Sequence, residues 1–240
     1  MSAAIWACLI CLGPVSASAR ASAPTSIAAL DRAYAEHLLV SRPDRGSREG
    51  VKGAADRLTP VTETSLERDR AWLGAFRARL DLVDRNRLSN VTKARLDTLR
   101  ARTTQQWEES RPDGPFRRDA LAYRALTDQA VLEVITARRV GDCERVRRAT
   151  ARLRMLPEVL RAAAINLRGA PYDDARVRRG VEDAVRTLRV EVTAAAAACR
   201  DARRIADFVE ADSTAIRAFR IFPGRLHDGP EKPDSRFTHH

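Results

Sequence analysis

Aromatic side chains are scarce in this chain of 240 residues, where Phe, Trp and Tyr together make up 5%. All-β domains build their sheets from aromatic and β-branched residues, and no segment here alternates apolar and polar residues as a half-buried strand does. Hydrophobic residues reach 44%, and many of them are alanine. The sequence therefore predicts an all-α protein, a bundle of about six to eight mostly antiparallel helices joined by short connections.

Lysine is nearly absent as well, since three of the 43 basic residues are lysine and 40 are arginine. The formal net charge is +11, but the arginines are spread along the chain and interleaved with acids, as in Glu67-Arg68-Asp69-Arg70. Nucleic-acid binders gather their basic residues in a patch or an arm. We therefore expect a solvated arginine-rich surface and no nucleic-acid partner, with polyanion binding as a minor alternative.

The signatures of well-known active sites are missing. The sequence contains no phosphate-binding glycine loop, no dinucleotide fingerprint and no Gly-x-Ser-x-Gly elbow. Four histidines are present, His37, His227, His239 and His240, and none belongs to a pair spaced as zinc ligands on one helix. We therefore assign no catalytic, cofactor-binding or metal-ligating residue to this chain.

The best candidates for a pair of metal ligands are two pairs of adjacent acids, at 108–109 and 173–174. The first pair precedes a Pro/Gly break, and Asp173 stands where a helix would begin, so we expect Asp173 to be a cap. The glycosylation sequon Asn90-Val91-Thr92 also falls at a predicted cap. Four aromatic residues lie in or beside apolar helical stripes and are expected in the core: Trp72, Phe76, Trp107 and Tyr123.

The first 23 residues resemble a signal peptide. An apolar run over 3–12 is too short to span a bilayer, and Ala17-Ser18-Ala19 has the shape of a cleavage site. No Lys or Arg precedes the apolar run, which departs from the usual pattern. We expect a periplasmic or secreted protein cleaved near Ala19, and not an integral membrane protein.

Two of the four cysteines, Cys8 and Cys11, lie within the predicted signal peptide, and neither is placed as the lipidated cysteine of a lipoprotein. Cys143 and Cys199 remain, in a compartment where disulfides persist. Their spacing leaves two alternatives open, a disulfide or two small buried residues on helix faces. No Cys-x-x-Cys motif supports thiol–disulfide exchange or a zinc ribbon.

Apolar residues recur at helical spacing through most of the remaining chain. The pattern predicts a loop over 43–53 and a break within 202–209. It predicts one helical domain over 24–222 and a flexible tail over 223–240. The first expected helix spans 26–41, the second begins at a capping box over 64–67, and the third runs from a cap at Ser89 or Asn90 to a break at 112–115. A fourth helix is expected over 118–140, and further helices are expected to begin at Gly141-Asp142, at Pro157 and after a cap at Asp173.

Several short segments of the sequence occur in an order that is typical of a known family. Asp56-Arg57-Leu58, Ala71-Trp72-Leu73 and Leu82-Val83-Asp84 precede the most similar part, RLRMLPEVL over 152–160 continuing to NLRGAP over 166–171. This ordered set resembles the bacterial domain-of-unknown-function 885 family over about Ile27 to Phe208. We expect the resemblance to end from about Ala211.

The resemblance implies large, mostly exported helical proteins that are similar to zinc metallopeptidases and carry a His-Glu zinc motif in their second half. No His-Glu dipeptide occurs in this sequence. The resemblance thus implies a non-catalytic N-terminal portion that walls a substrate cleft. Zinc is expected only with the missing C-terminal half, and the expected partner is that half or another protein covering exposed helix faces. The alternative is a self-standing exported binding or scaffold protein.

Overall fold

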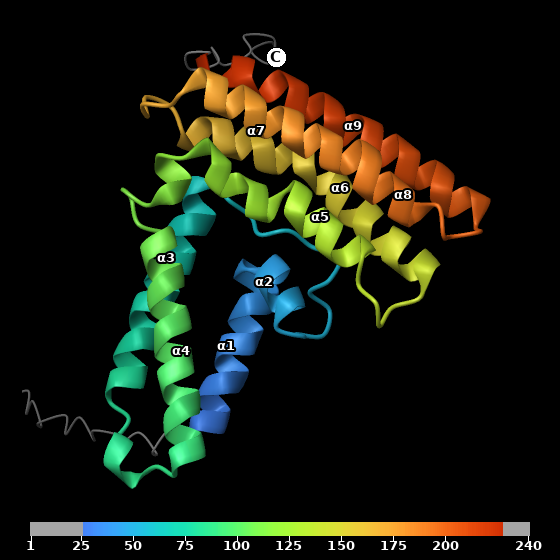
Figure 1. Cartoon of the computed structure of the whole chain (residues 1–240). Helices are drawn as coiled ribbons and strands as arrows, with labels where there is room; N and C mark the ends of the chain where they lie inside the picture. The colour runs from blue at the N-terminus through green and yellow to red at the C-terminus, as the bar shows by residue number, and fades with distance from the viewer. Residues whose placement is uncertain (1–25, 228–240) are drawn as a thin grey trace, which may run out of the picture.

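The computed structural model describes residues 26–227, which are helical with short connections and contain no strand. This confirms the predicted all-α bundle. The helices form two lobes that meet at an angle (Figure 1). The N-terminal lobe holds α1–α4, and the C-terminal lobe holds α5–α9 together with two short 3-10 segments before α5. No helix within 26–227 has the length and apolar character that crossing a membrane requires.

The N-terminal lobe is a small bundle built around one apolar cluster. Tyr34 of α1, Phe76 of α3 and Leu96 of α4 are buried at its centre. The short helix α2 lies at the junction with the other lobe (Figure 1). The elements are α1 (Ile27–Ser41), α2 (Pro43–Arg48), α3 (Glu63–Asp81), η1 (Arg85–Arg87) and α4 (Asn90–Glu109).

The C-terminal lobe has the larger core. Helix α6 packs along α9, and α5, α7 and the π-helical turn η4 cover them. The loop after α2 contributes Leu58 and Val61 to this core, so the chain ties the two lobes together there. The elements are η2 (Pro115–Arg117), η3 (Ala120–Leu126), α5 (Asp128–Ile135), α6 (Asp142–Asn166), α7 (Asp174–Arg186), η4 (Thr187–Val192), α8 (Thr193–Ala196) and α9 (Ala202–His227).

Side-chain caps fix most helix starts. Ser26, Ser89 and Asp173 each accept a hydrogen bond from the backbone N–H three residues on. The caps at Ser89 and Asp173 were predicted from the sequence. The predicted capping box at 64–67 was wrong, because Thr62 caps α3 and the helix begins at Glu63. The Ser65 hydroxyl turns back to the Pro60 carbonyl at 2.9 Å, which draws the start of the helix toward the preceding loop.

Three other boundaries differ from the prediction. Residues 43–48 form helix α2 instead of a loop, because Pro43 at its first position has a backbone angle that suits a helix. The segment 118–140 is not one helix but the 3-10 turn η3 followed by α5, since Asp119 caps η3 and Thr127 bonds back to the Tyr123 carbonyl. Pro157 does not start a helix: it lies inside α6, which continues because its neighbours Leu156 and Leu160 are buried.

The predicted break within 202–209 was wrong, because these residues belong to helix α9. The chain breaks just before Ala202, and Asp201 accepts a hydrogen bond from the Arg204 N–H. From there α9 runs through Pro223 to His227, because Phe222 and Leu226 bury against the core. Residues 223–227 are therefore helical and not part of a tail. The predicted signal peptide and the rest of the predicted tail lie outside the described residues.

Cys143 and Cys199 form a disulfide, which settles the alternative that the sequence left open. The bond joins the first turn of α6 to the turn that follows α8. It closes the loop made by α6, α7, η4 and α8, and so fixes the end of the C-terminal lobe where α9 begins.

Candidate functional site

A groove runs between the two lobes, and we call it the interlobe groove. Its central hollow of about 260 Å³ has Arg42, Arg45, Arg48 and Glu109 on the N-terminal side. The opposite wall, from the C-terminal lobe, is largely apolar and is formed by Pro115, Phe116, Ala122, Ala125 and Leu126.

The groove continues at both ends of this hollow. One extension, of about 520 Å³, shares Glu109 and Pro115 with the hollow and reaches Arg118. The other, of about 440 Å³, shares Arg48 and Ala125 and passes along α5 to Thr136. The result is an open channel in which charged groups face an apolar wall at the central hollow, while mostly polar and charged residues line the two extensions.

Arg42, at the junction of α1 and α2, anchors a buried ionic network beneath the groove. Its Nη2 and Nε atoms donate to one oxygen of Asp69 at 2.7 and 2.9 Å. Its Nη1 donates to Glu109 at 2.5 Å, and Nη2 also reaches the Gln106 carbonyl at 3.0 Å. Burial alone would lower the pKa of Arg42, but the two carboxylates outweigh it and raise that pKa. These four hydrogen bonds tie Arg42 to α3 and α4.

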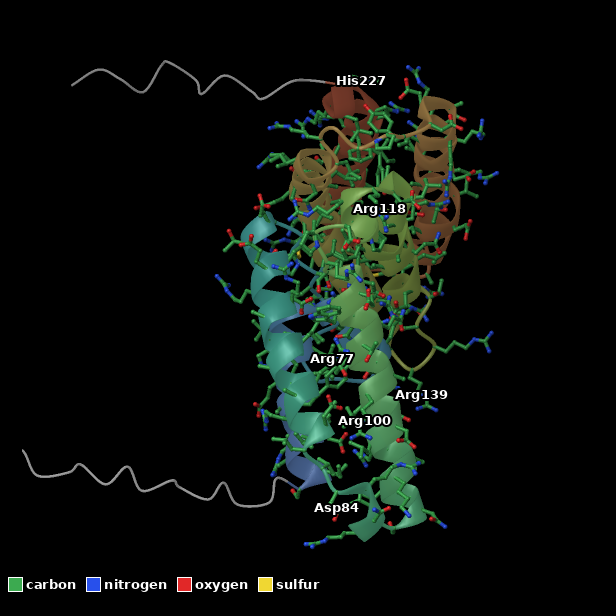
Figure 2. All side chains as sticks on the ribbon, turned by 90° about the vertical axis from the view of Figure 1, so that its left-hand side faces the viewer. Arg77, Asp84, Arg100, Arg118, Arg139 and His227 are labelled. Atoms are coloured by element: carbon green, nitrogen blue, oxygen red, sulfur yellow. A yellow bond between two sulfur atoms is a disulfide. The ribbon has the colours of Figure 1, made fainter. Side chains whose placement is uncertain are left out.

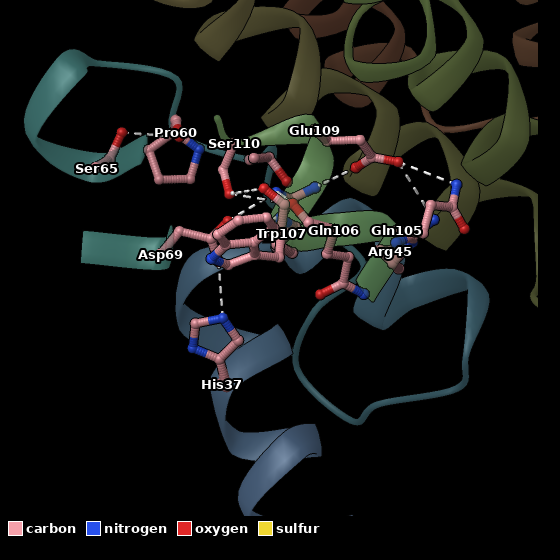
Figure 3. Close-up of polar contacts among 12 residues, drawn as sticks. His37, Arg45, Pro60, Ser65, Asp69, Gln105, Gln106, Trp107, Glu109 and Ser110 are labelled. Carbon is pink, nitrogen blue, oxygen red and sulfur yellow. Dashed lines mark hydrogen bonds and ion pairs between the residues drawn. The ribbon is translucent and has the colours of Figure 1, made fainter. Parts of the chain in front are cut away.

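His37 completes this network from α1. Its Nε2 lies 2.7 Å from Asp69 Oδ1, and its ring stacks on Trp72 with 3.6 Å between centroids. Burial alone would raise the pKa of Asp69, yet the bonds from His37 and Arg42 hold it below its usual value. His37, one of the four histidines in the sequence, is buried in this polar cluster (Figure 3).

A second polar network holds the lobes together at the far side of the hollow. Buried Asp44 accepts hydrogen bonds from Thr59 and from Arg48, the latter at 2.9 Å. Arg48 also reaches across to Glu133 of α5 at 3.2 Å. Buried Arg152 of α6 donates to the Ala55 carbonyl at 2.8 Å, so the loop after α2 is fixed to the C-terminal lobe.

Arg45 differs from the other arginines of the hollow. Its side chain is 19% exposed, and its guanidinium makes no hydrogen bond to any residue within 26–227. Its nearest acid is Glu109, with Nη2 3.9 Å from Oε1. Glu109 is already bound by Arg42 and by Gln105 Nε2 at 3.0 Å (Figure 3). Of the three arginines that line the central hollow, Arg45 is the one whose donors are largely unused by residues within 26–227.

The structure places the candidate residues from the sequence in different parts of the molecule. Glu109 belongs to the network and Glu108 lines the groove edge, whereas Asp173 caps α7 as predicted. Asp174 lies 3.3 Å from His227, which is helical and not in a tail. Phe76 and Tyr123 are buried as expected, and Trp72 and Trp107 are partly covered, while His239 and His240 lie outside the described residues.

Charged side chains cover both lobes. Arg77 and Arg100 project from the N-terminal lobe, and Arg118 and Arg139 from the C-terminal lobe (Figure 2). Many arginines are paired with an acid one turn away on the same helix, as Arg147 is with Glu144. In this view the basic groups are dispersed over the surface.

The zinc implied by the family resemblance does not fit the side chains of the described part. Within 26–227 no group of three or more His, Cys, Asp and Glu residues is placed to hold a metal ion. His37 meets Asp69 together with Arg42, and His227 meets Asp174 together with Tyr172, so each histidine has one acid and a competing polar partner. We derive no reaction step through zinc.

The network was missed because its members are far apart in sequence. His37 and Asp69 are separated by 32 residues, and Arg42 and Glu109 by 67. One local signal was available: Asp69 lies three residues after Leu66 and four before Leu73, on the buried stripe of α3. An acid on such a stripe indicates a buried partner, although it does not identify which one.

A solved structure with the same fold comes from Shewanella oneidensis and is described as "a putative lipoprotein of unknown function". The TM-score is 0.68 at 16% sequence identity, which shows a shared fold alone. The alignment covers 84% of this chain but 37% of the Shewanella protein. No curated protein matches the chain.

The family described as bacterial protein of unknown function (DUF885) matches residues 43–223. The match continues past Ala211, where the resemblance was predicted to end, because helix α9 extends unbroken through that point. Since the match spans most of the 240 residues, the chain belongs to the DUF885 family.

Proposed function

We propose that this chain supplies a non-catalytic helical domain of an exported DUF885 protein, and that the interlobe groove is one wall of the cleft where that protein binds a peptide. The observation that carries the proposal is the groove itself. It is open at both ends, with charged side chains facing an apolar wall at the central hollow and mostly polar and charged residues along both extensions. An extended peptide, which offers polar main-chain groups and alternating side chains, suits such a channel.

The catalytic residues of the proposed protein would lie outside this chain. The family resemblance associates activity with a His-Glu zinc motif, and this sequence has no His-Glu dipeptide. The chain also spans 37% of the Shewanella protein, so that protein has a large part with no counterpart here. Export is supported by the signal-like first 23 residues and is compatible with the description of the Shewanella protein as a lipoprotein.

A second candidate is a self-standing exported binding protein that uses the same groove. It is favoured by the distribution of exposed apolar residues in the described part, which do not form one docking face. They are scattered over α1, the turn after α3, α4, α6, η4 and α9: Val40, Leu82, Val91, Ile165, Val190, Val209 and Ile221.

Binding of a short fluorescein-labelled peptide, followed by fluorescence anisotropy, tests the groove. Ala125 is exposed and lines both the hollow and one extension, so Ala125→Trp fills the channel without disturbing the core. We expect this variant to weaken binding by about tenfold or more, since a blocked groove loses most of its contacts. Ala75→Trp, at an exposed alanine of α3 outside the groove, is the matched control. Equal binding by both variants, or no binding by the natural chain, would contradict the proposal.

Zinc loading tests the non-catalytic assignment. The natural chain is incubated with zinc, freed of excess metal, and assayed for bound zinc and for hydrolysis of an internally quenched peptide. We expect neither stoichiometric zinc nor hydrolysis that a chelator abolishes. Zinc-dependent cleavage by this chain alone would place catalysis within it and overturn the assignment.

A further inference from the structure

We propose that the interlobe groove selects peptides carrying an Asp or Glu side chain, and that Arg45 is the residue that binds the carboxylate. The inference deepens the proposed peptide binding and rests on it. It names the class of ligand that the groove prefers and the side chain responsible for the preference.

The state of the Arg45 guanidinium is the first argument. An arginine has five N–H donors, and a buried arginine normally uses several of them. Arg45 is four-fifths covered, yet it makes no hydrogen bond within 26–227 and lies 3.9 Å from its nearest acid. A carboxylate entering the hollow would supply the acceptors that the fold does not, in the forked geometry that arginine favours.

The other charges of the hollow do not compete for this role. Arg42 is held by Asp69 and Glu109, and Arg48 by Asp44 and Glu133. Glu109, the acid nearest Arg45, also contacts Arg42 at 2.5 Å. An incoming carboxylate therefore meets Arg45 beside an acid whose charge Arg42 offsets in part, since Arg42 is shared with Asp69.

The opposite wall strengthens the expected pair. Phe116, Ala122 and Leu126 face the charged side across a hollow of about 260 Å³. Apolar atoms next to an ion pair exclude water and lower the local dielectric, so the attraction between the charges increases. The hollow is several times the roughly 30 Å³ that one water molecule occupies in the liquid, and so it can accept a carboxyl-bearing side chain.

The shape of the groove identifies the source of the carboxylate. The channel extends in both directions from the hollow, toward Arg118 on one side and along α5 to Thr136 on the other. A peptide can therefore pass through with residues on both sides of the bound group. This geometry fits an internal acidic side chain and not a chain terminus.

The test compares two labelled peptides that differ at one central position, Glu or Gln, each made with a free and with an amidated C-terminus. The natural chain should bind the Glu peptide about tenfold more tightly than the Gln peptide, as expected for one charge-assisted hydrogen-bonded pair. Amidation should not change that ratio. Equal affinity for the two peptides, or a ratio that disappears on amidation, would overturn the inference.

Arg45→Gln should abolish the preference and leave binding of the Gln peptide nearly unchanged. Arg179→Gln, at an exposed arginine of α7 outside the groove, removes the same charge and should keep the preference. Arg45→Lys keeps the charge without the fork and should reduce the ratio in part, which provides a second variant if the glutamine form does not fold. A preference that survives in Arg45→Gln would assign the selectivity to another residue and contradict the proposal.

The outcomes separate this inference from the function on which it rests. If both peptides bind equally and Ala125→Trp blocks them, the groove binds peptides and the role of Arg45 is wrong. If neither peptide binds to the natural chain, the peptide-binding function itself fails.

Discussion

Asp69 is the acid on which the polar interior of the N-terminal lobe depends. It accepts hydrogen bonds from Arg42 and pairs with His37, and all three side chains are almost fully buried. A buried ion pair contributes little net stability when intact, but removal of one partner leaves an uncompensated charge in a poorly solvated place. The position is therefore far less tolerant of change than an acid on the surface.

Asp69→Asn is expected to destabilise the protein strongly, by about 3–5 kcal/mol, because Arg42 then keeps only Glu109 as a counter-charge. Urea unfolding followed by circular dichroism measures the change. Asp97→Asn, which removes an acid from an exposed pair with Arg85, serves as the control and should have little effect. Similar unfolding midpoints for the two variants would contradict the assigned role of Asp69.

The stability of the protein is expected to depend on pH through Asp212. Burial on α9 raises its pKa to about 6, so the folded state favours the protonated acid. Because the folded pKa lies above the unfolded value of about 3.9, the stabilisation from this proton is fully present below that value and is lost as the pH rises through 6.

Asp212→Asn should therefore stabilise the protein at pH 7, by about 1–2 kcal/mol after allowance for solvent screening, and the gain should vanish near pH 4. Thermal unfolding at a series of pH values measures it. Glu210→Gln removes an exposed acid from the same helix and should show no such trend. A constant difference across the pH range would show that Asp212 does not carry the protonation effect.

At the scale of helices, the sequence predicted those features that depend on neighbouring residues alone, such as helix caps. The caps at Ser89 and Asp173 could be predicted because their side chains satisfy N–H groups within the same helix turn. Pro157 was misplaced because continuation of α6 through a proline depends on packing against α9, which no local pattern reports. The groove was missed for the same reason, since Arg45 and Phe116 meet only when the lobes are assembled.

The contact of α7 with η3 depends on a missing side chain at Gly180. A Cβ atom there would lie 2.3 Å from Cδ2 of Leu121, so Gly180→Ala should force Leu121 to move. We expect a loss of about 1–3 kcal/mol despite the better helix propensity of alanine. In a Leu121→Ala background the clash is gone, and the same change should instead stabilise by up to about 1 kcal/mol.

A double-mutant cycle measured by urea unfolding checks this contact. Opposite signs for Gly180→Ala in the two backgrounds are the expected result. The same sign and size in both would show that Leu121 does not restrict position 180.

For the molecule as a whole, the relation between the lobes defines the groove. Arg152 donates to the Ala55 carbonyl and Asn166 Nδ2 to the Val61 carbonyl at 2.6 Å, so the loop after α2 is held by hydrogen bonds from α6. Arg48 and Glu133 add a contact across the channel. These connections set the width of the groove at α2, where Arg45 lies.

Hydrogen–deuterium exchange with and without the Glu peptide tests the central claim most directly, because it reports where the peptide binds. We expect slower exchange in three segments that line the interlobe groove, 42–48, 105–118 and 122–136, and unchanged exchange in the outer helices α7 and α9. The protection should be lost in Ala125→Trp and retained in Ala75→Trp. Protection confined to α7 and α9, or none at saturating peptide, would contradict the assignment of the interlobe groove as the peptide site.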